Sequence, residues 1–139
     1  METKGLKEKI EKIDKLIKKY SSGYLDNGSQ IFYDFYFQPD YENFSIKLMI
    51  GPINVEGNIG KMASRIIEEK YGVKITSFDS SWGQWYRQTN LQSVFSIIIP
   101  EDEYLYDDIF EKLCKAANEY HKEIKRLEDA MTKLIVSAH

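Results

Sequence analysis

Cysteine, histidine and proline are all scarce in this chain. Its 139 residues include one cysteine, Cys114, two histidines, His121 and His139, and three prolines. A single cysteine excludes an internal disulfide and is the usage expected in a reducing compartment. No group of His and Cys has the spacing of a zinc site, so we expect no metal and no other cofactor. Cys114 and His121 are roughly 10 Å apart along a helix, too far for a nucleophile–base pair.

Long apolar runs and a strong charge imbalance are also missing. No stretch approaches the ~20 apolar residues that a membrane-spanning helix needs, and the amino-terminal segment is charged and amphipathic, unlike a secretory signal. We therefore expect a cytoplasmic protein with no membrane partner. The net charge of −3 is uneven, because residues 1–20 carry seven Lys against four acidic side chains and residues 101–139 carry six basic against ten acidic ones. This asymmetry is more typical of matched surfaces within a fold than of a nucleic-acid footprint.

What the chain does contain is a long amphipathic pattern near its C-terminal end, over residues 103–136. Apolar side chains recur there at alternating steps of four and three residues, at Tyr106, Phe110, Leu113, Ala117, Tyr120, Ile124, Leu127, Met131 and Leu134. This heptad spacing predicts a helix of about 50 Å, whereas a compact chain of this size has a radius of gyration of about 14 Å. We expect the helix to extend beyond its own body and to form a homodimer seam with Tyr120, Ile124, Leu127 and Met131. The alternative, compatible with the first, is that the helix simply packs on a sheet.

A shorter basic helix is predicted over residues 4–20, and we expect it to lie beside the acidic long helix. Alternation and turn residues predict strands at 30–38, 44–50, 73–78 and 91–99, a short extra strand at 53–56, a helix from 58 or 60 to 71, and a loop at 79–90. The 42% hydrophobic and 29% charged residues are typical of a globular chain. We therefore predict one α+β domain over residues 1–139: an antiparallel sheet of four to five strands with helices on one face, in the order α-β-β-(β)-α-β-β-α with a long C-terminal helix.

The face of this sheet that points away from the helices is predicted to be half apolar. Alternation along the strands assigns to it Phe32, Asp34, Tyr36, Lys47, Met49, Thr76, Phe78, Gln92, Val94, Ser96 and Ile98. An exposed apolar patch larger than a few hundred Å² is typical of an interaction site. Two alternatives stay open: a register error of one residue, which would exchange the faces of a strand, or a 79–90 segment that folds over the patch.

The 79–90 segment is itself rich in the residue types of binding hot spots. Trp82, Trp85, Tyr86 and Arg87 lie within a few polar residues of one another, and Trp, Tyr and Arg dominate the binding energy of protein interfaces. The alternative is that the rings cap an open end of the core and leave the indole N–H in water. With the sheet face, they complete the predicted binding residues: Phe32, Tyr36, Met49, Phe78, Trp82, Trp85, Tyr86 and Arg87.

Two family resemblances bear on function. Gly57-Asn58-Ile59-Gly60, followed by a predicted helix and strand, resembles the GxxG loop of a KH module, which implies binding of a single-stranded nucleic-acid backbone. Its two middle residues are not basic, unlike the pattern expected of a nucleic-acid footprint. In layout and size the chain is also similar to small acidic dimeric type III secretion chaperones, which implies a protein partner.

The function we expect from the sequence is non-enzymatic protein binding. Adjacent carboxylates such as Asp107 and Asp108 are not placed across a cleft, so they provide no acid–base pair. An adaptor, a secretion-type chaperone, or an immunity or inhibitor protein that occludes a target would fit the acidic balance and the apolar sheet face. The expected partners are another protein and a second copy of the chain. The alternative is a KH-like single-stranded nucleic-acid binder that uses the Gly57–Gly60 loop and the aromatics of Trp82–Arg87.

Overall fold

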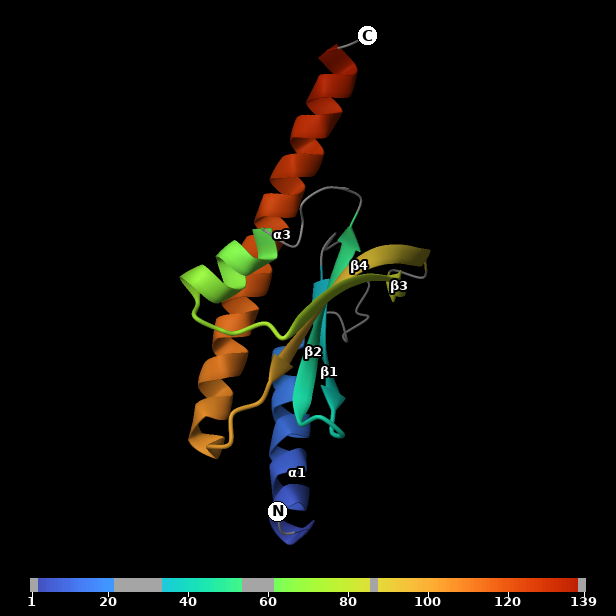
Figure 1. Ribbon diagram of the computed structural model, residues 1–139. Helices are drawn as coiled ribbons and strands as arrows, with labels where there is room; N and C mark the ends of the chain where they lie inside the picture. Colours follow the sequence, from blue (N-terminus) through green and yellow to red (C-terminus); the bar gives the residue numbers. More distant parts are fainter. Residues whose placement is uncertain (1–2, 22–33, 54–61, 86–87, 138–139) are drawn as a thin grey trace.

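The computed structural model describes residues 3–21, 34–53, 62–85 and 88–137, and the following statements concern these residues (Figure 1). Their elements, in chain order, are α1 (Thr3–Tyr20), β1 (Asp34–Asp40), β2 (Ser45–Ile53), the short π-helix η1 (Ser64–Lys70), β3 (Ser77–Trp85), β4 (Gln88–Ile98), the 3-10 turn η2 (Glu103–Leu105) and α3 (Tyr106–Ser137). The predicted α+β class and element order are confirmed, as is the long C-terminal helix.

All strand pairs are antiparallel, and the sheet order is β1-β2-β4-β3. The loop predicted at 79–90 is wrong, because most of it forms a hairpin in which β3 and β4 pair from Ser77–Ser96 to Trp85–Gln88. The serines, aspartate and glycine of β3 disfavour a strand by propensity. At the edge of a sheet, however, β3 is held by pairing with β4 and most of its side chains remain in water. Of the extra strand predicted at 53–56, Ile53 ends β2 and residues 54–56 lie outside the described ranges.

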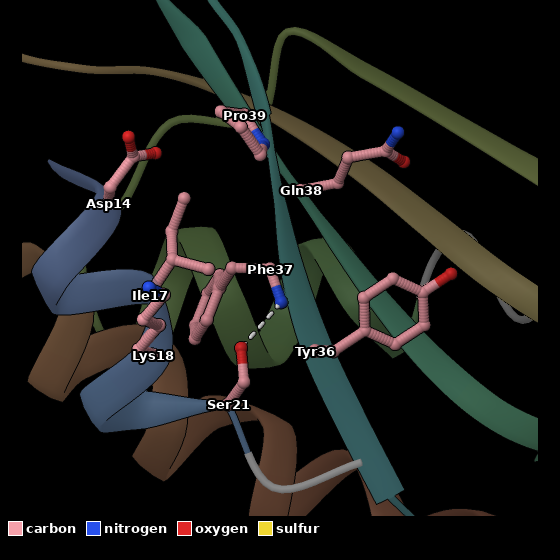
Figure 2. Close-up of a pocket in the computed structure, with 8 residues that line it drawn as sticks. All are labelled: Asp14, Ile17, Lys18, Ser21, Tyr36, Phe37, Gln38 and Pro39. Atoms are coloured by element: carbon pink, nitrogen blue, oxygen red, sulfur yellow. Dashed lines mark hydrogen bonds between the residues drawn. The ribbon is translucent and has the colours of Figure 1, made fainter. Parts of the chain in front are cut away.

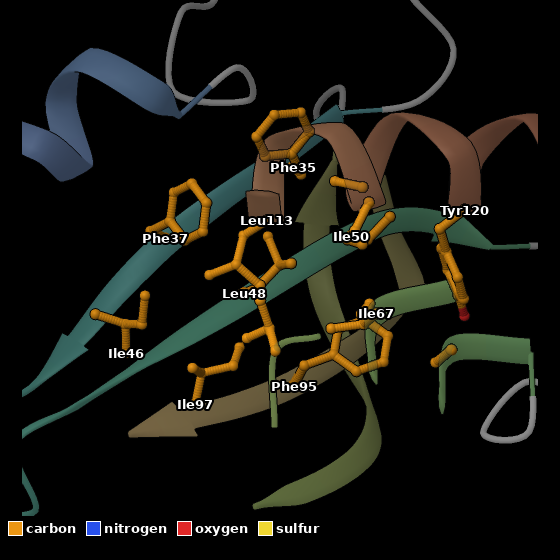
Figure 3. Packing of buried hydrophobic residues seen from close by; sticks show 14 of the residues in the cluster. Phe35, Phe37, Ile46, Leu48, Ile50, Ile67, Phe95, Ile97, Leu113 and Tyr120 are labelled. Carbon is orange, nitrogen blue, oxygen red and sulfur yellow. The ribbon is translucent and has the colours of Figure 1, made fainter. Parts of the chain in front are cut away.

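One face of the sheet packs on the helices and forms the core. Alternate residues of β1, β2 and β4 point to the same side because side chains alternate along a strand, and there they meet α1, η1 and α3 (Figure 3). The central members of this cluster, all buried, are Phe35, Phe37, Ile46, Leu48, Ile50, Ile67, Phe95, Ile97, Leu113 and Tyr120. Tyr120 packs edge-on against Phe95, with ring centroids 5.6 Å apart.

The register also settles which way β3 faces. Phe78 lies directly opposite Phe95, a core residue, and their ring centroids are 5.2 Å apart. Residues directly opposite in an antiparallel pair share a face, so Phe78 is on the helix side and not on the outer face to which alternation assigned it. The prediction placed a strand at 73–78 with Thr76 and Phe78 facing outward. In the structure Ser77 is the residue that faces outward, because it pairs with the outward Ser96. The predicted alternation was therefore wrong by one residue, and Phe78 faces the helices.

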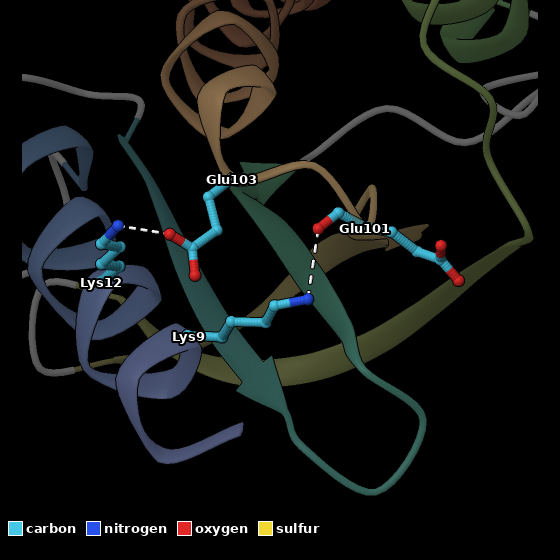
Figure 4. Close-up of polar contacts among 4 residues, drawn as sticks. All are labelled: Lys9, Lys12, Glu101 and Glu103. Carbon is cyan, nitrogen blue, oxygen red and sulfur yellow. Dashed lines mark hydrogen bonds and ion pairs between the residues drawn. The ribbon is translucent and has the colours of Figure 1, made fainter. Parts of the chain in front are cut away.

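The basic first helix lies against the start of the acidic last one, as the charge pattern predicted. Lys12 pairs with the carboxylate of Glu103, and Lys9 Nζ donates to the carbonyl oxygen of Glu101 at 3.2 Å (Figure 4). Lys19 Nζ lies 3.9 Å from an Asp107 carboxylate oxygen. The side chains of these pairs are largely exposed, so the ion pairs contribute little to the stability of the fold. Their main effect is to orient α1 relative to the start of α3.

The long helix α3 extends past the sheet, and its C-terminal part projects from the body (Figure 1). Its apolar stripe is fully buried from Tyr106 to Ile124. Farther along the same stripe, Leu127 is half-buried, Met131 is 46% exposed and Leu134 is 71% exposed. The prediction that this helix is longer than its body can cover agrees with this gradient.

Candidate protein-binding surfaces

The exposed edge of the sheet is the first candidate surface. β3 is the last strand in the order β1-β2-β4-β3, so within the described residues its outer side pairs with no strand. Two aromatic side chains four residues apart share one face of it: Phe78 is 37% exposed and Trp82 is 71% exposed. Trp82 lies opposite Leu91 toward the end of β3. An exposed backbone edge and exposed aromatic side chains therefore coincide on β3.

The opposite edge, β1, is protected. Helix α1 lies beside it, and the backbone N–H of Phe37 donates to Ser21 Oγ at 3.0 Å (Figure 2). Pro39 has no N–H to offer. Beside this contact, α1 and β1 line a cavity of about 460 Å³, with Asp14 and Lys18 on its helix side. The covering helix, the side-chain hydrogen bond and the proline are devices by which proteins prevent an edge from pairing with another chain.

Trp85 covers the outer face of the sheet at one end. Its indole N–H donates to Gln92 Oε1 at 2.9 Å, its ring lies 5.5 Å from that of Tyr36, and only 4% of the residue is exposed. Gly51 allows this approach, because a Cβ there would lie 2.7 Å from Trp85 Cε2. Met49 is buried on the same face, and burial raises the pKa of Tyr36. Trp85 therefore caps the sheet, and its N–H is bonded inside the protein instead of to water.

The predicted binding residues thus divide into three groups. Phe32, Tyr86 and Arg87 lie outside the described residues. Tyr36 and Met49 lie on the outer face with Trp85, which caps it, whereas Phe78 and Trp82 are on the exposed edge strand. The structure separates side chains that the sequence placed in one surface.

Outside α3, two exposed apolar side chains are absent from the predicted site. Ile98, at the end of β4, is 60% exposed, and Tyr104, in η2, is 79% exposed. Ile98 borders a cavity of about 340 Å³ between β4 and the start of α3, beside the Asp108–Lys112 ion pair. Alternation had put Ile98 on the outer face, but Tyr104 carries no periodic signal, since it stands among acidic residues before the helix.

The predicted dimer seam on α3 has two different halves. Tyr120 and Ile124 are buried in the chain's own core, and the Tyr120 hydroxyl forms a 2.7 Å hydrogen bond with Ser93 Oγ. Leu127 and Met131 lie where the stripe emerges from the body, followed by Leu134. The part of the seam available to another chain is therefore the C-terminal part, Leu127–Leu134.

Glu119 and Cys114, two titratable side chains that the structure describes, are both held in structural contacts. Glu119 accepts hydrogen bonds from Lys70 Nζ at 2.7 Å and from the Tyr71 hydroxyl at 2.6 Å, and these contacts hold its pKa below the usual value. The Cys114 thiol donates to the Tyr20 carbonyl oxygen at 3.7 Å, and burial raises its pKa to about 12. Because the thiolate is the reactive form, Cys114 is a weak nucleophile at neutral pH. Among the described residues, no three His, Cys, Asp or Glu side chains are grouped so that they could hold a metal ion.

Comparisons with protein families, with curated proteins and with solved structures found no match to this chain. Within the ranges that the structure covers, no helix combines the length and the apolar character needed to cross a membrane.

Proposed function

We propose that this chain is a non-enzymatic protein-binding module, and that its partner protein packs on the projecting end of α3. The observation that carries the proposal is the change in exposure along one continuous apolar stripe. Five turns of the stripe are core, but Met131 and Leu134 continue it with 46% and 71% of their surfaces in water. Apolar side chains at this spacing on one helix face are typical of a helix that lies in the groove of another protein.

The charges beside the stripe favour a partner with an apolar groove and no strong charge of one sign. Residues 125–134 carry Lys125, Arg126 and Lys133 against Glu128 and Asp129. Arg126 pairs with Glu123 on the same helix at 3.1 Å. Binding to a nucleic acid would need a stripe of basic side chains instead. Binding to an acidic protein would likewise need a cluster of basic side chains. A mixed apolar and charged surface of this kind fits an adaptor, a chaperone, or an inhibitor or immunity protein.

The proposal is tested by capture of partners from a lysate of the native host, with and without nuclease. We expect a protein to be retained by the wild-type chain in both conditions. Leu134→Lys should abolish the capture, because it places a charge in the apolar contact. Thr132→Lys is the matched control: it adds the same charge two residues away, at an exposed position that is off the stripe.

Both variants should melt within a few degrees of the wild type, since exposed substitutions change stability by about 0.5 kcal/mol or less. Loss of the captured material on nuclease treatment would replace the proposal with nucleic-acid binding. Capture that survives Leu134→Lys would show that the end of α3 is not the binding surface.

A further inference from the structure

We infer that β3 is the surface through which two copies of this chain pair, strand against strand, in an antiparallel arrangement about Ser80. The first ground is the difference between the two sheet edges. β1 is closed by α1, by the Ser21–Phe37 hydrogen bond and by Pro39. Among the described residues no helix closes β3, and Ser77–Trp85 contains no lysine and no proline. Its one charged residue is Asp79, whose carboxylate accepts the Ser80 N–H at 2.8 Å. An edge of this kind is a ready template for another strand.

The second ground is that β3 is complementary to itself. Two identical antiparallel strands are related by a two-fold axis. With the axis at Ser80, Phe78 of one copy lies opposite Trp82 of the other, and the same contact occurs again on the far side of the axis. These are the two exposed aromatic residues of the strand, and both lie on the helix side of the sheet. Aromatic residues directly opposite each other stabilise antiparallel strand pairs.

The other face of the paired strands is compatible with the same axis. Asp79 would lie opposite Ser81 of the second copy, and Ser77 opposite Gly83, so no like charges meet. An axis one residue earlier would place Asp79 opposite its own copy, which is unfavourable. An axis one residue later would leave Phe78 opposite Gln84 and Trp82 opposite Ser80. The register about Ser80 pairs both aromatics and separates the carboxylates, and this self-complementarity favours a second copy over an unrelated strand.

The resulting assembly is one continuous sheet of eight strands, four from each copy, with β3 next to β3 at its centre. The pairing satisfies the outward backbone N–H and C=O groups of both edge strands and covers Phe78 and Trp82. The surface is separate from the end of α3, so dimerisation and partner binding fail independently in experiments.

The test is the mass in solution, measured by analytical ultracentrifugation, of the wild type, Ser80→Lys and Ser80→Glu. Ser80 is exposed, so each substitution leaves the subunit folded. We expect a two-chain mass for the wild type and a one-chain mass for each variant alone, because two like charges meet at the axis. An equal mixture of the two variants should recover the two-chain mass, because an ammonium then lies opposite a carboxylate.

The register is tested by cysteine cross-linking in a Cys114→Ala background. Ser80→Cys should form a disulfide between the copies on mild oxidation, since opposite residues in an antiparallel pair lie within disulfide reach. Gln84→Cys is the control: it would lie opposite Thr76, with roughly 26 Å along the strand between it and its own copy, so no cross-link should form.

A one-chain wild-type mass would overturn the inference. So would a two-chain mass that persists in both Ser80 variants, or one that Leu134→Lys abolishes, since the latter would place the dimer contact on α3. A Ser80 variant that is monomeric but still captures the partner protein would support the inference and leave the proposed function intact.

Discussion

A buried hydrogen bond links the long helix to the middle of the sheet. The hydroxyls of Tyr120 and Ser93 are 2.7 Å apart, and both residues are fully buried. Burial raises the pKa of the Tyr120 hydroxyl, so it stays protonated and each group satisfies the other. Heptad spacing identifies Tyr120 as a residue that avoids water, but spacing cannot tell whether a sheet or a second helix covers it. Ser93 on the strand gives no signal of its own in the sequence.

We predict that Tyr120→Phe lowers the free energy of unfolding by about 1–3 kcal/mol, because the Ser93 hydroxyl remains buried without its partner. Ser93→Ala should have a similar cost for the complementary reason. The double variant should cost less than the sum of the two, since no buried hydroxyl is then left unpaired. Urea denaturation of the four proteins measures this, and strictly additive costs would mean that the hydroxyls do not depend on each other.

At the scale of elements, strongly periodic segments were predictable and the β3–β4 hairpin was not. The helices at 4–20 and 103–136 and the strand at 44–50 each carry an apolar period, and they were found as α1, α3 and β2. β3 has no such period because both of its faces are largely exposed. Its strand structure comes from pairing with the apolar β4, a contact between segments that composition does not report. Because β3 was not predicted as a strand over Ser77–Trp85, Phe78 was assigned to the wrong face. For the same reason Trp82 and Trp85, which lie on opposite faces of β3, were assigned to one surface.

The way in which Trp85 folds over β2 can be tested at Gly51. An alanine methyl at this position would lie 2.7 Å from Trp85 Cε2, so the indole would have to move off the sheet. We expect Gly51→Ala to destabilise the protein by about 1–3 kcal/mol, as overpacking does in a filled site. The emission of Trp85 should also shift to the red as its ring meets water.

The measurement is best made in a Trp82→Phe background, because Trp82 is 71% exposed and would mask the change. Emission and stability that both match the Trp82→Phe parent would show that the ring of Trp85 does not rest on Gly51 in solution.

At the scale of the whole molecule, α3 serves as core over most of its length and projects from the body at its end. Its 32 residues span about 48 Å, and the sheet covers the stripe only as far as Ile124. The sequence predicted the excess length from geometry alone. The sequence could not show at which residue of α3 the stripe becomes exposed. That position depends on how far the strands extend along the helix, and the ends of the strands are set by their pairing.

This division predicts a gradient of mutational cost along one helix face. Ile124→Ala removes a fully buried side chain and should lower the free energy of unfolding by about 2–5 kcal/mol. Leu134→Ala removes a side chain of the same size from the same stripe, but one that is mostly in water, and should cost no more than about 0.5 kcal/mol. Urea denaturation of both variants at several protein concentrations measures the difference.

A large cost for Leu134→Ala that grows with protein concentration would mean that the end of α3 is covered by a second copy, because only association makes stability depend on concentration. A small cost at every concentration would leave this end of the helix free in the purified protein, as the proposed contact with a different protein requires.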